Sequence, residues 1–92
     1  MNYWLLKTEP HDFSYADLAA AGTEIWDGVR GRQAQSYFRK MNAGDMAFIY
    51  HTGKERAVTG VAEIVSAAIP DPTDPAWQAV KVEARYPLQR PV

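Results

Sequence analysis

The order of apolar segments along the chain is the feature that most restricts its fold. An apolar run at residues 3–6 comes first, two helical segments follow it, and three strand-like runs come after them. Strands that follow one another through short connections pair in an antiparallel manner. Helices that precede such strands pack on one end of the sheet. The sequence therefore predicts an α+β fold, either an open sheet or a small open β-barrel, made mostly of antiparallel strands.

Both helices have recognisable boundaries or faces. Ser14 begins the first with the Ser-x-x-acid pattern of a capping box, which Asp17 completes, and Gly22 ends it. The second covers residues 32–41, where apolar residues spaced i, i+3, i+4 and i+7 form one stripe: Ala34, Tyr37, Phe38 and Met41. The polar side chains of this segment lie off the stripe: Gln33, Gln35, Arg39 and Lys40.

The strand predictions depend on apolar runs and on glycine and proline. We expect a buried strand at residues 3–6, a brief strand or bridge at 25–26, and longer strands at 46–50, 58–65 and 80–86. Gly60 interrupts one of these runs, where a glycine marks a bulge or a bend. Residues 52–55 are predicted as a hairpin loop and residues 70–75, with three prolines, as a stiff loop. The strand at 80–86 is expected at an edge of the sheet unless further chain pairs with it.

Composition limits the classes of function. The chain has 92 residues, 47% of them hydrophobic and 23% charged, as in one small globular domain. There is no cysteine, which excludes disulfides and thiolate chemistry and fits a reducing compartment. No apolar stretch approaches the length needed to span a membrane. We therefore expect a cytoplasmic protein with no membrane partner.

The net charge of −1 neither indicates nor excludes a nucleic-acid partner. Four cations do lie within eleven positions: Arg30, Arg32, Arg39 and Lys40. The two histidines, His11 and His51, do not form a metal-ligand cluster, and no Gly-rich phosphate loop or nucleophile motif occurs. We expect no metal and no cofactor, and we assign no catalytic residue.

Three short polar and aromatic runs are the candidates for a binding pocket. Each follows or adjoins an apolar stretch, and together they supply a cation, carboxylates, hydroxyls and aromatic rings. The predicted pocket residues are Lys7, Thr8, Glu9, Trp26, Asp27, Gly28, Tyr50, His51 and Thr52. Phosphate contacts are predicted for Arg30, with Arg32 and Lys54 assisting, although ordinary surface charge explains the last two equally well.

A nucleobase lifted from its stack needs a planar wall and hydrogen-bond partners for its polar edge. Trp26 is the candidate wall, with a role in the core as the alternative, whereas Trp4 is expected in the core and Trp77 at its edge. Lys7 and Glu9 alternate on one face of a strand end and can read a base edge, or else form an exposed ion pair. Thr8 between them is expected to point away.

In their order and spacing, several of these runs closely resemble the EVE domain family. They are Tyr3-Trp4-Leu5-Leu6-Lys7-Thr8-Glu9-Pro10, Trp26-Asp27-Gly28-Val29-Arg30, Gln33-Ala34, Gly44-Asp45, Tyr50-His51-Thr52 and Pro70-Asp71-Pro72-Thr73. The resemblance implies a PUA-like fold, a small open β-barrel of mostly antiparallel strands with helices at the barrel ends. It also implies binding of modified bases, notably modified cytosines in DNA, rather than catalysis.

The chain departs from the family pattern in two places. Gly31 stands where an Asn is common, and Gln35 and Ser36 stand where Arg and Asn are common. If those side chains touch the nucleic acid in relatives, base preference differs here. The family also continues beyond the end of this sequence, so we expect residues 1–92 to be one EVE domain that lacks its C-terminal part, with one wall of the pocket affected.

Three functions follow from these observations. The first is a module that binds a modified base, a modified cytosine in DNA. The second is a module that binds RNA or transfer RNA, as PUA-like domains do. The third is a hydrolase acting on an acylated nucleoside, in which Lys7 activates a Thr8 nucleophile with Glu9 as acidic partner. The expected alternation of side chains along the strand argues against the third.

Overall fold

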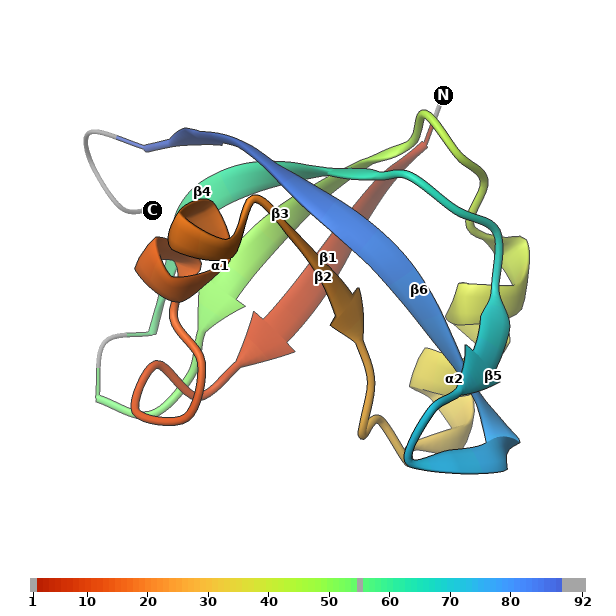
Figure 1. Ribbon diagram of the computed structural model, residues 1–92. Helices are drawn as coiled ribbons and strands as arrows, with labels where there is room; N and C mark the ends of the chain where they lie inside the picture. Colours follow the sequence, from red (N-terminus) through yellow and green to blue (C-terminus); the bar gives the residue numbers. More distant parts are fainter. Residues whose placement is uncertain (1, 55, 89–92) are drawn as a thin grey trace.

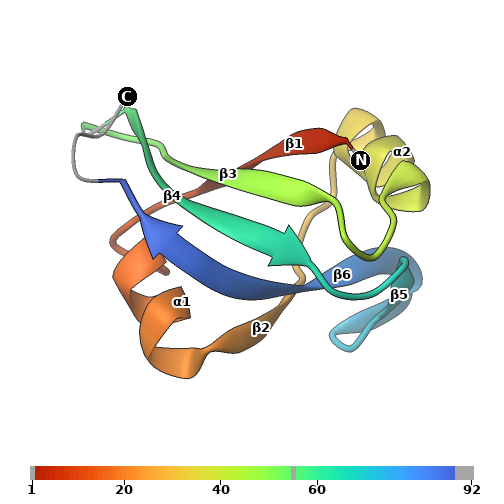
Figure 2. The same ribbon diagram turned by 90° about the horizontal axis from the view of Figure 1, so that it is seen from above.

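The computed structural model describes residues 2–54 and 56–88, which form a curled sheet with two helices (Figure 1). The elements follow one another as β1 (Tyr3–Thr8), α1 (Tyr15–Ala21), β2 (Thr23–Trp26), α2 (Arg32–Lys40), β3 (Met46–His51), β4 (Ala57–Ile64), β5 (Ile69–Asp71) and β6 (Asp74–Pro87). The predicted α+β class is confirmed. Figure 2 shows α1 and α2 at opposite ends of the sheet, so the expectation that both helices pack on one end is wrong.

The main sheet has the strand order β1-β3-β4-β6-β2, and β5 pairs with β6 as a hairpin. The pairs β3–β4, β4–β6, β2–β6 and β5–β6 are antiparallel, while β1 runs parallel to β3. In the described part of the chain β1 and β2 are the two edges and do not pair with each other. The barrel is therefore open, as predicted, and the space between its edges is where a site can form.

Three strand predictions need correction. Strand β1 is an edge strand rather than a buried one: Tyr3 is 65% exposed and Leu5 is 50% exposed, because only alternate side chains face the core. Strand β6 is not an edge strand, since it pairs with both β4 and β2. Residues 70–75 form the β5–β6 hairpin instead of a loop, and Pro70 is tolerated there because β5 pairs on one side only.

Helix α1 forms as its sequence predicts. The Ser14 side chain accepts a hydrogen bond from the Asp17 amide, and the Asp17 carboxylate accepts one from the Ser14 amide, which completes the capping box. At the other end the Gly22 amide donates to the Leu18 carbonyl at 2.8 Å. Gly22 has φ of +82°, a conformation that favours glycine. Local sequence thus fixes both ends of this short helix.

The core lies inside the curl of the sheet, between its inner face and the two helices. Its buried members include Leu6, Tyr15, Leu18, Trp26, Phe38, Met41, Ile49, Ile64, Val80 and Val82. Trp4, predicted to be core, is partly buried against this cluster and donates its indole N–H to Asp45 at 3.0 Å. Tyr37, on the predicted apolar stripe of α2, is 41% exposed, whereas the off-stripe Gln35 is only 3% exposed.

Gly60 is required for α1 to approach the sheet. A Cβ atom on Gly60 would lie 2.4 Å from ring carbons of Tyr15, which no real structure allows. The predicted irregularity is confirmed next to it: Ile49 pairs with Gly60 and Tyr50 with Val58, so Thr59 is the extra residue of a bulge. The ring of Tyr15 therefore packs directly on backbone at the bend of β4.

Gly60→Ala should consequently destabilise the fold. We expect a loss of about 1–3 kcal/mol of unfolding free energy, the usual cost of overpacking, visible as a lower melting temperature. In a Tyr15→Ala background the same substitution should cost much less, because its clash partner is gone. Equal costs in the two backgrounds would show that the ring contact does not explain this glycine.

Candidate functional site

A cavity of about 420 Å³ opens between the segment after β1 and the segment around the end of β2. One wall consists of Lys7, Thr8, Glu9, Asp12 and Phe13, and the other of Glu24, Ile25, Trp26, Asp27, Gly28 and Val29. The volume is within the usual range for small-ligand sites. Six of the predicted pocket residues thus line one cavity, although they come from two runs separated in the sequence.

Trp26 forms the apolar floor of this cavity. It ends β2, is 8% exposed, and forms a T-shaped pair with the Phe13 ring at a centroid distance of 5.9 Å and an interplanar angle of 76°. The Phe13 amide donates to the Glu9 carbonyl, and the Thr8 hydroxyl donates to the Phe13 carbonyl at 2.7 Å. Trp26 therefore belongs to the core and also lines the cavity, while its role as a stacking wall for a base stays a prediction.

A second hollow of about 250 Å³ lies between β1 and α2, and Lys7, Trp26 and Val29 belong to both. Its remaining lining is mostly apolar: Leu5, Leu6, Gln33, Ala34, Tyr37, Phe38 and Met41. Trp26 thus belongs to the lining of both hollows. A flat ligand in the first cavity would meet polar groups at the rim and apolar groups at the floor.

The rim of the first cavity is acidic. It carries four exposed carboxylates, Glu9, Asp12, Glu24 and Asp27, and a single ammonium group, Lys7. Carboxylates accept hydrogen bonds from amines, as from the N4 amine of cytosine. Phosphate groups would be repelled. The rim therefore favours a ligand edge that carries hydrogen-bond donors.

The third predicted run is near this cavity but does not line it. The parallel pairing of β1 with β3 places Thr8 opposite His51, as expected from their positions at strand ends. However, His51 is buried and its Nε2 accepts a hydrogen bond from the Tyr15 amide at 3.0 Å. Thr52 donates both its amide and its hydroxyl to the Thr8 carbonyl. Tyr50 is opposite Lys7 and is absent from the lining. Thr52 therefore holds the end of β1, and His51 holds the start of α1, beside the cavity and not in its lining.

The Thr8 hydroxyl is directed at the Phe13 carbonyl and not at Lys7 or Glu9, although all three residues line the cavity. Thr8 is partly buried between the exposed Lys7 and Glu9, and its hydroxyl is held by the Phe13 carbonyl. No hydrogen bond joins that hydroxyl to Lys7 or Glu9 in the described structure. The arrangement lacks the contact between nucleophile and base that a lysine-activated hydroxyl needs.

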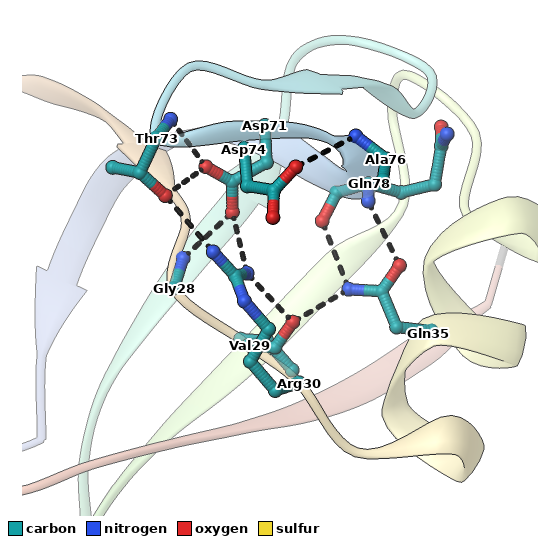
Figure 3. A network of polar contacts seen from close by, with 9 residues as sticks. All are labelled: Gly28, Val29, Arg30, Gln35, Asp71, Thr73, Asp74, Ala76 and Gln78. Carbon is teal, nitrogen blue, oxygen red and sulfur yellow. Dashed lines mark hydrogen bonds and ion pairs between the residues drawn. The ribbon is translucent and has the colours of Figure 1, made fainter.

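The predicted phosphate contacts are dispersed. Arg30 donates Nη1 to Asp71 at 3.0 Å and Nη2 to Thr73 at 3.0 Å (Figure 3). Its guanidinium carbon lies 5.2 Å from the centroid of the Trp77 ring. Lys54 lies in the β3–β4 turn, beside Gly53 and Arg56. Arg32 lies at the start of α2, in a groove separate from the Trp26 cavity.

Asp71 joins the segment after β2 to the β5–β6 hairpin, and the sequence analysis assigned it no role. The carboxylate is 1% exposed and accepts hydrogen bonds from the Gly28 amide at 2.8 Å, from Arg30, and from the amide and hydroxyl of Thr73 (Figure 3). It thereby ties the cavity wall at Gly28 to the β5–β6 hairpin. An aspartate two residues before a threonine in a turn is the pattern of an Asx turn, which was the available signal.

Gln35 is a second tie that sequence reasoning missed. Its side-chain amide donates to the Val29 carbonyl at 2.8 Å and to the Gln78 carbonyl at 3.0 Å, and its oxygen accepts from the Gln78 amide at 2.8 Å (Figure 3). The other departures from the family pattern are also explained locally. Gly31 caps α2 without a side-chain hydrogen bond, and Ser36 donates to the Gln33 carbonyl.

The hydrogen bonds to Asp71 lower the pKa of its carboxyl far below the usual value, first through the Thr73 side chain and then through Gly28 and Arg30, against the opposing effect of desolvation. A depressed carboxyl pKa stabilises the fold above the unfolded value of about 3.9, and this stabilisation is lost as the pH falls.

Asp71→Asn should therefore lower the melting temperature at pH 7, with a deficit that shrinks as the pH falls from about 5 towards 2. Thermal unfolding followed by circular dichroism across this range measures it. Asp12→Asn, at an exposed carboxylate of the rim, is the matched control. A deficit for Asp71→Asn that is constant with pH would contradict the assigned role of the charge.

Two classes of site receive no support in the described residues. Residues 2–54 and 56–88 contain no group of three or more histidine, cysteine, aspartate or glutamate side chains placed to hold a metal ion. Neither of the two helices found there is long and apolar enough to cross a membrane.

The comparisons with known proteins agree with this geometry. The sequence model of the EVE domain matches residues 2–92, and the chain therefore belongs to the EVE domain family. Thymocyte nuclear protein 1 of Mus musculus is 36% identical over 110 residues, which cover 89% of this chain and 49% of the relative. The Homo sapiens protein is 40% identical over 84 residues, which cover 78% and 37%. The chain thus spans half or less of the length of these relatives.

Solved structures show the same PUA-like fold. Protein Atu2648 from Agrobacterium tumefaciens has a TM-score of 0.94 and 37% identity, over 100% of this chain and 66% of its own. Human THYN1 protein, solved in complex with 5-methylcytosine-containing DNA, has a TM-score of 0.91 and 32% identity, over 100% of this chain and 70% of its own.

Proposed function

We propose that this chain is a nucleic-acid-binding module that takes a modified base, a modified cytosine in DNA, into the cavity at Trp26. The observation that carries the proposal is the combination of an aromatic floor and an acidic rim in one cavity of suitable size. The likeness to human THYN1, solved with 5-methylcytosine-containing DNA, supports it. In this proposal the module binds its base and does not transform it.

The floor and the rim have different tasks. Stacking on an aromatic side chain contributes about 1–3 kcal/mol per base, whatever the base. Selectivity therefore comes from the rim. The carboxylate of Glu9 or Asp27 accepts a hydrogen bond from the N4 amine of cytosine, and the Lys7 ammonium donates one to the ring carbonyl. Thymine and uracil present a carbonyl where cytosine presents the amine, so the acidic rim disfavours them.

The stacking role predicts the effect of replacing Trp26. Trp26→Ala is unsuitable, because truncating a core tryptophan costs about 3–5 kcal/mol of stability. Trp26→Leu keeps much of the apolar volume, and we expect it to weaken binding of an oligonucleotide with one 5-methylcytosine by about 5- to 150-fold, the equivalent of 1–3 kcal/mol. Fluorescence anisotropy measures the affinity. Trp4→Leu, outside the cavity, is the control and should leave binding unchanged.

The rim role predicts a second effect. Glu9→Gln removes one charge-assisted hydrogen bond, so we expect a loss of about tenfold, or 1.4 kcal/mol, for the modified cytosine. Glu83→Gln makes the same charge change outside the cavity and corrects for general attraction of DNA. Equal affinity of the wild type for modified and unmodified DNA would refute the proposal. Tighter binding of a matched RNA oligonucleotide would favour an RNA-binding module instead.

A further inference from the structure

A groove of about 440 Å³ lies between α2 and the β5–β6 hairpin, separate from the cavity at Trp26 and from the hollow between β1 and α2. Its lining combines two cations, an amide and an aromatic ring: Arg32, Gln35, Arg39, Ala76 and Trp77. Gln35 holds the two walls together through the backbone of Gln78 and Val29. The groove is thus a built feature of the fold, braced by a buried side chain.

The two arginines of the groove are available for a ligand. Arg32 and Arg39 are exposed, and neither guanidinium group makes a hydrogen bond or ion pair with any residue of 2–54 and 56–88. They are seven positions apart, so they share one face of α2 and are separated by about 10 Å along its axis. Because every nucleotide of a DNA strand carries one phosphate charge, two arginines at this separation can contact different phosphates of the same strand.

The carboxylates of the neighbouring hairpin are already engaged. Asp71 is bound by Arg30, Gly28 and Thr73, and Asp74 accepts a hydrogen bond from the Ala76 amide. The Arg30 guanidinium covers the ring of Trp77. A cationic and aromatic surface therefore remains, which is the combination that holds a nucleic-acid strand by its phosphates and a flanking base or sugar.

The groove and the Trp26 cavity adjoin through one short segment. Gly28 lines the cavity, and Arg30, two residues later, contacts the Trp77 ring that lines the groove. The two sites have opposite charge: four carboxylates at the cavity rim and two unpaired guanidinium groups in the groove. An acidic rim repels the phosphates of the strand whose base it accepts. The strand must be held by cations elsewhere.

We infer that the groove of Arg32, Arg39 and Trp77 binds the sugar–phosphate backbone of a DNA strand whose modified base occupies the Trp26 cavity. This inference rests on the proposed function, since it concerns the same ligand. It replaces the phosphate role predicted for Arg30, which holds the Trp77 ring and Asp71, and it does not include Lys54, which lies in the β3–β4 turn.

The test is the salt dependence of DNA binding by the double variant Arg32→Gln/Arg39→Gln. The slope of log K against log salt should become shallower by about 2, since each phosphate contact on duplex DNA contributes about 0.9. Affinity should fall by the same factor for 5-methylcytosine and unmodified cytosine, leaving their ratio unchanged. The double variant Lys40→Gln/Lys81→Gln makes the same charge change outside the groove. Its slope should differ from that of the wild type by less than a quarter of the change expected for Arg32→Gln/Arg39→Gln.

The ratio and the slope separate the two proposals. If the wild type prefers modified DNA but both double variants have the same slope, the backbone-binding role of the groove is refuted and the base-binding role of the cavity is supported. A wild type without base preference, whose slope still depends on Arg32 and Arg39, would refute the cavity proposal while supporting the groove. No measurable binding to any oligonucleotide would overturn both. Circular dichroism confirms that each variant is folded.

Discussion

The buried carboxylate of Asp71 is the interaction on which the candidate site depends. It connects the Gly28 amide at the cavity wall, the Arg30 guanidinium and Thr73 of the β5–β6 hairpin. Gly28 and Asp71 are 43 positions apart in the sequence. A buried charge is tolerated only when it is paired and hydrogen-bonded, and every one of these partners is polar or cationic. The segment after β2 has no helix or strand of its own, so this carboxylate and Gln35 position it.

Arg30 is paired with Asp71 in that network. The other charged groups near the site lie on two separate surfaces. Carboxylates surround the opening above Trp26, while Arg32 and Arg39 face the groove beside Trp77. Stacking energy is similar for all bases, so the floor alone cannot select one. In the proposed binding mode, selection falls to the carboxylates and attraction for the strand falls to the arginines. Under that proposal, this division accounts for binding of a polyanion by a chain with a net charge of −1.

Local signals predicted much of this structure. The capping box at Ser14, the helix at α2 and the strands of the sheet follow from patterns within a few residues. Residues of the two polar and aromatic runs that begin at Lys7 and Trp26 line one cavity, and their role in binding stays a prediction. The errors concern long-range pairing. The sequence around Gln35 does not indicate that its side chain will hydrogen-bond to the backbone of Gln78. The sequence around His51 does not indicate that its Nε2 will accept a hydrogen bond from the Tyr15 amide. The three prolines of residues 70–75 predict a loop, and this prediction is wrong because a hairpin strand that pairs on one side only tolerates proline.

The most direct test of the division between base cavity and backbone groove is an NMR titration of the ¹⁵N-labelled protein. The nucleoside 5-methyl-2′-deoxycytidine, which has no phosphate, should shift the Trp26 indole and Gly28 amide signals and leave the Arg32 and Arg39 side-chain signals unchanged. A short oligonucleotide with one 5-methylcytosine should shift both sets. Nucleoside-induced shifts confined to the β3–β4 turn, or an oligonucleotide that leaves the arginine signals unchanged, would contradict this account.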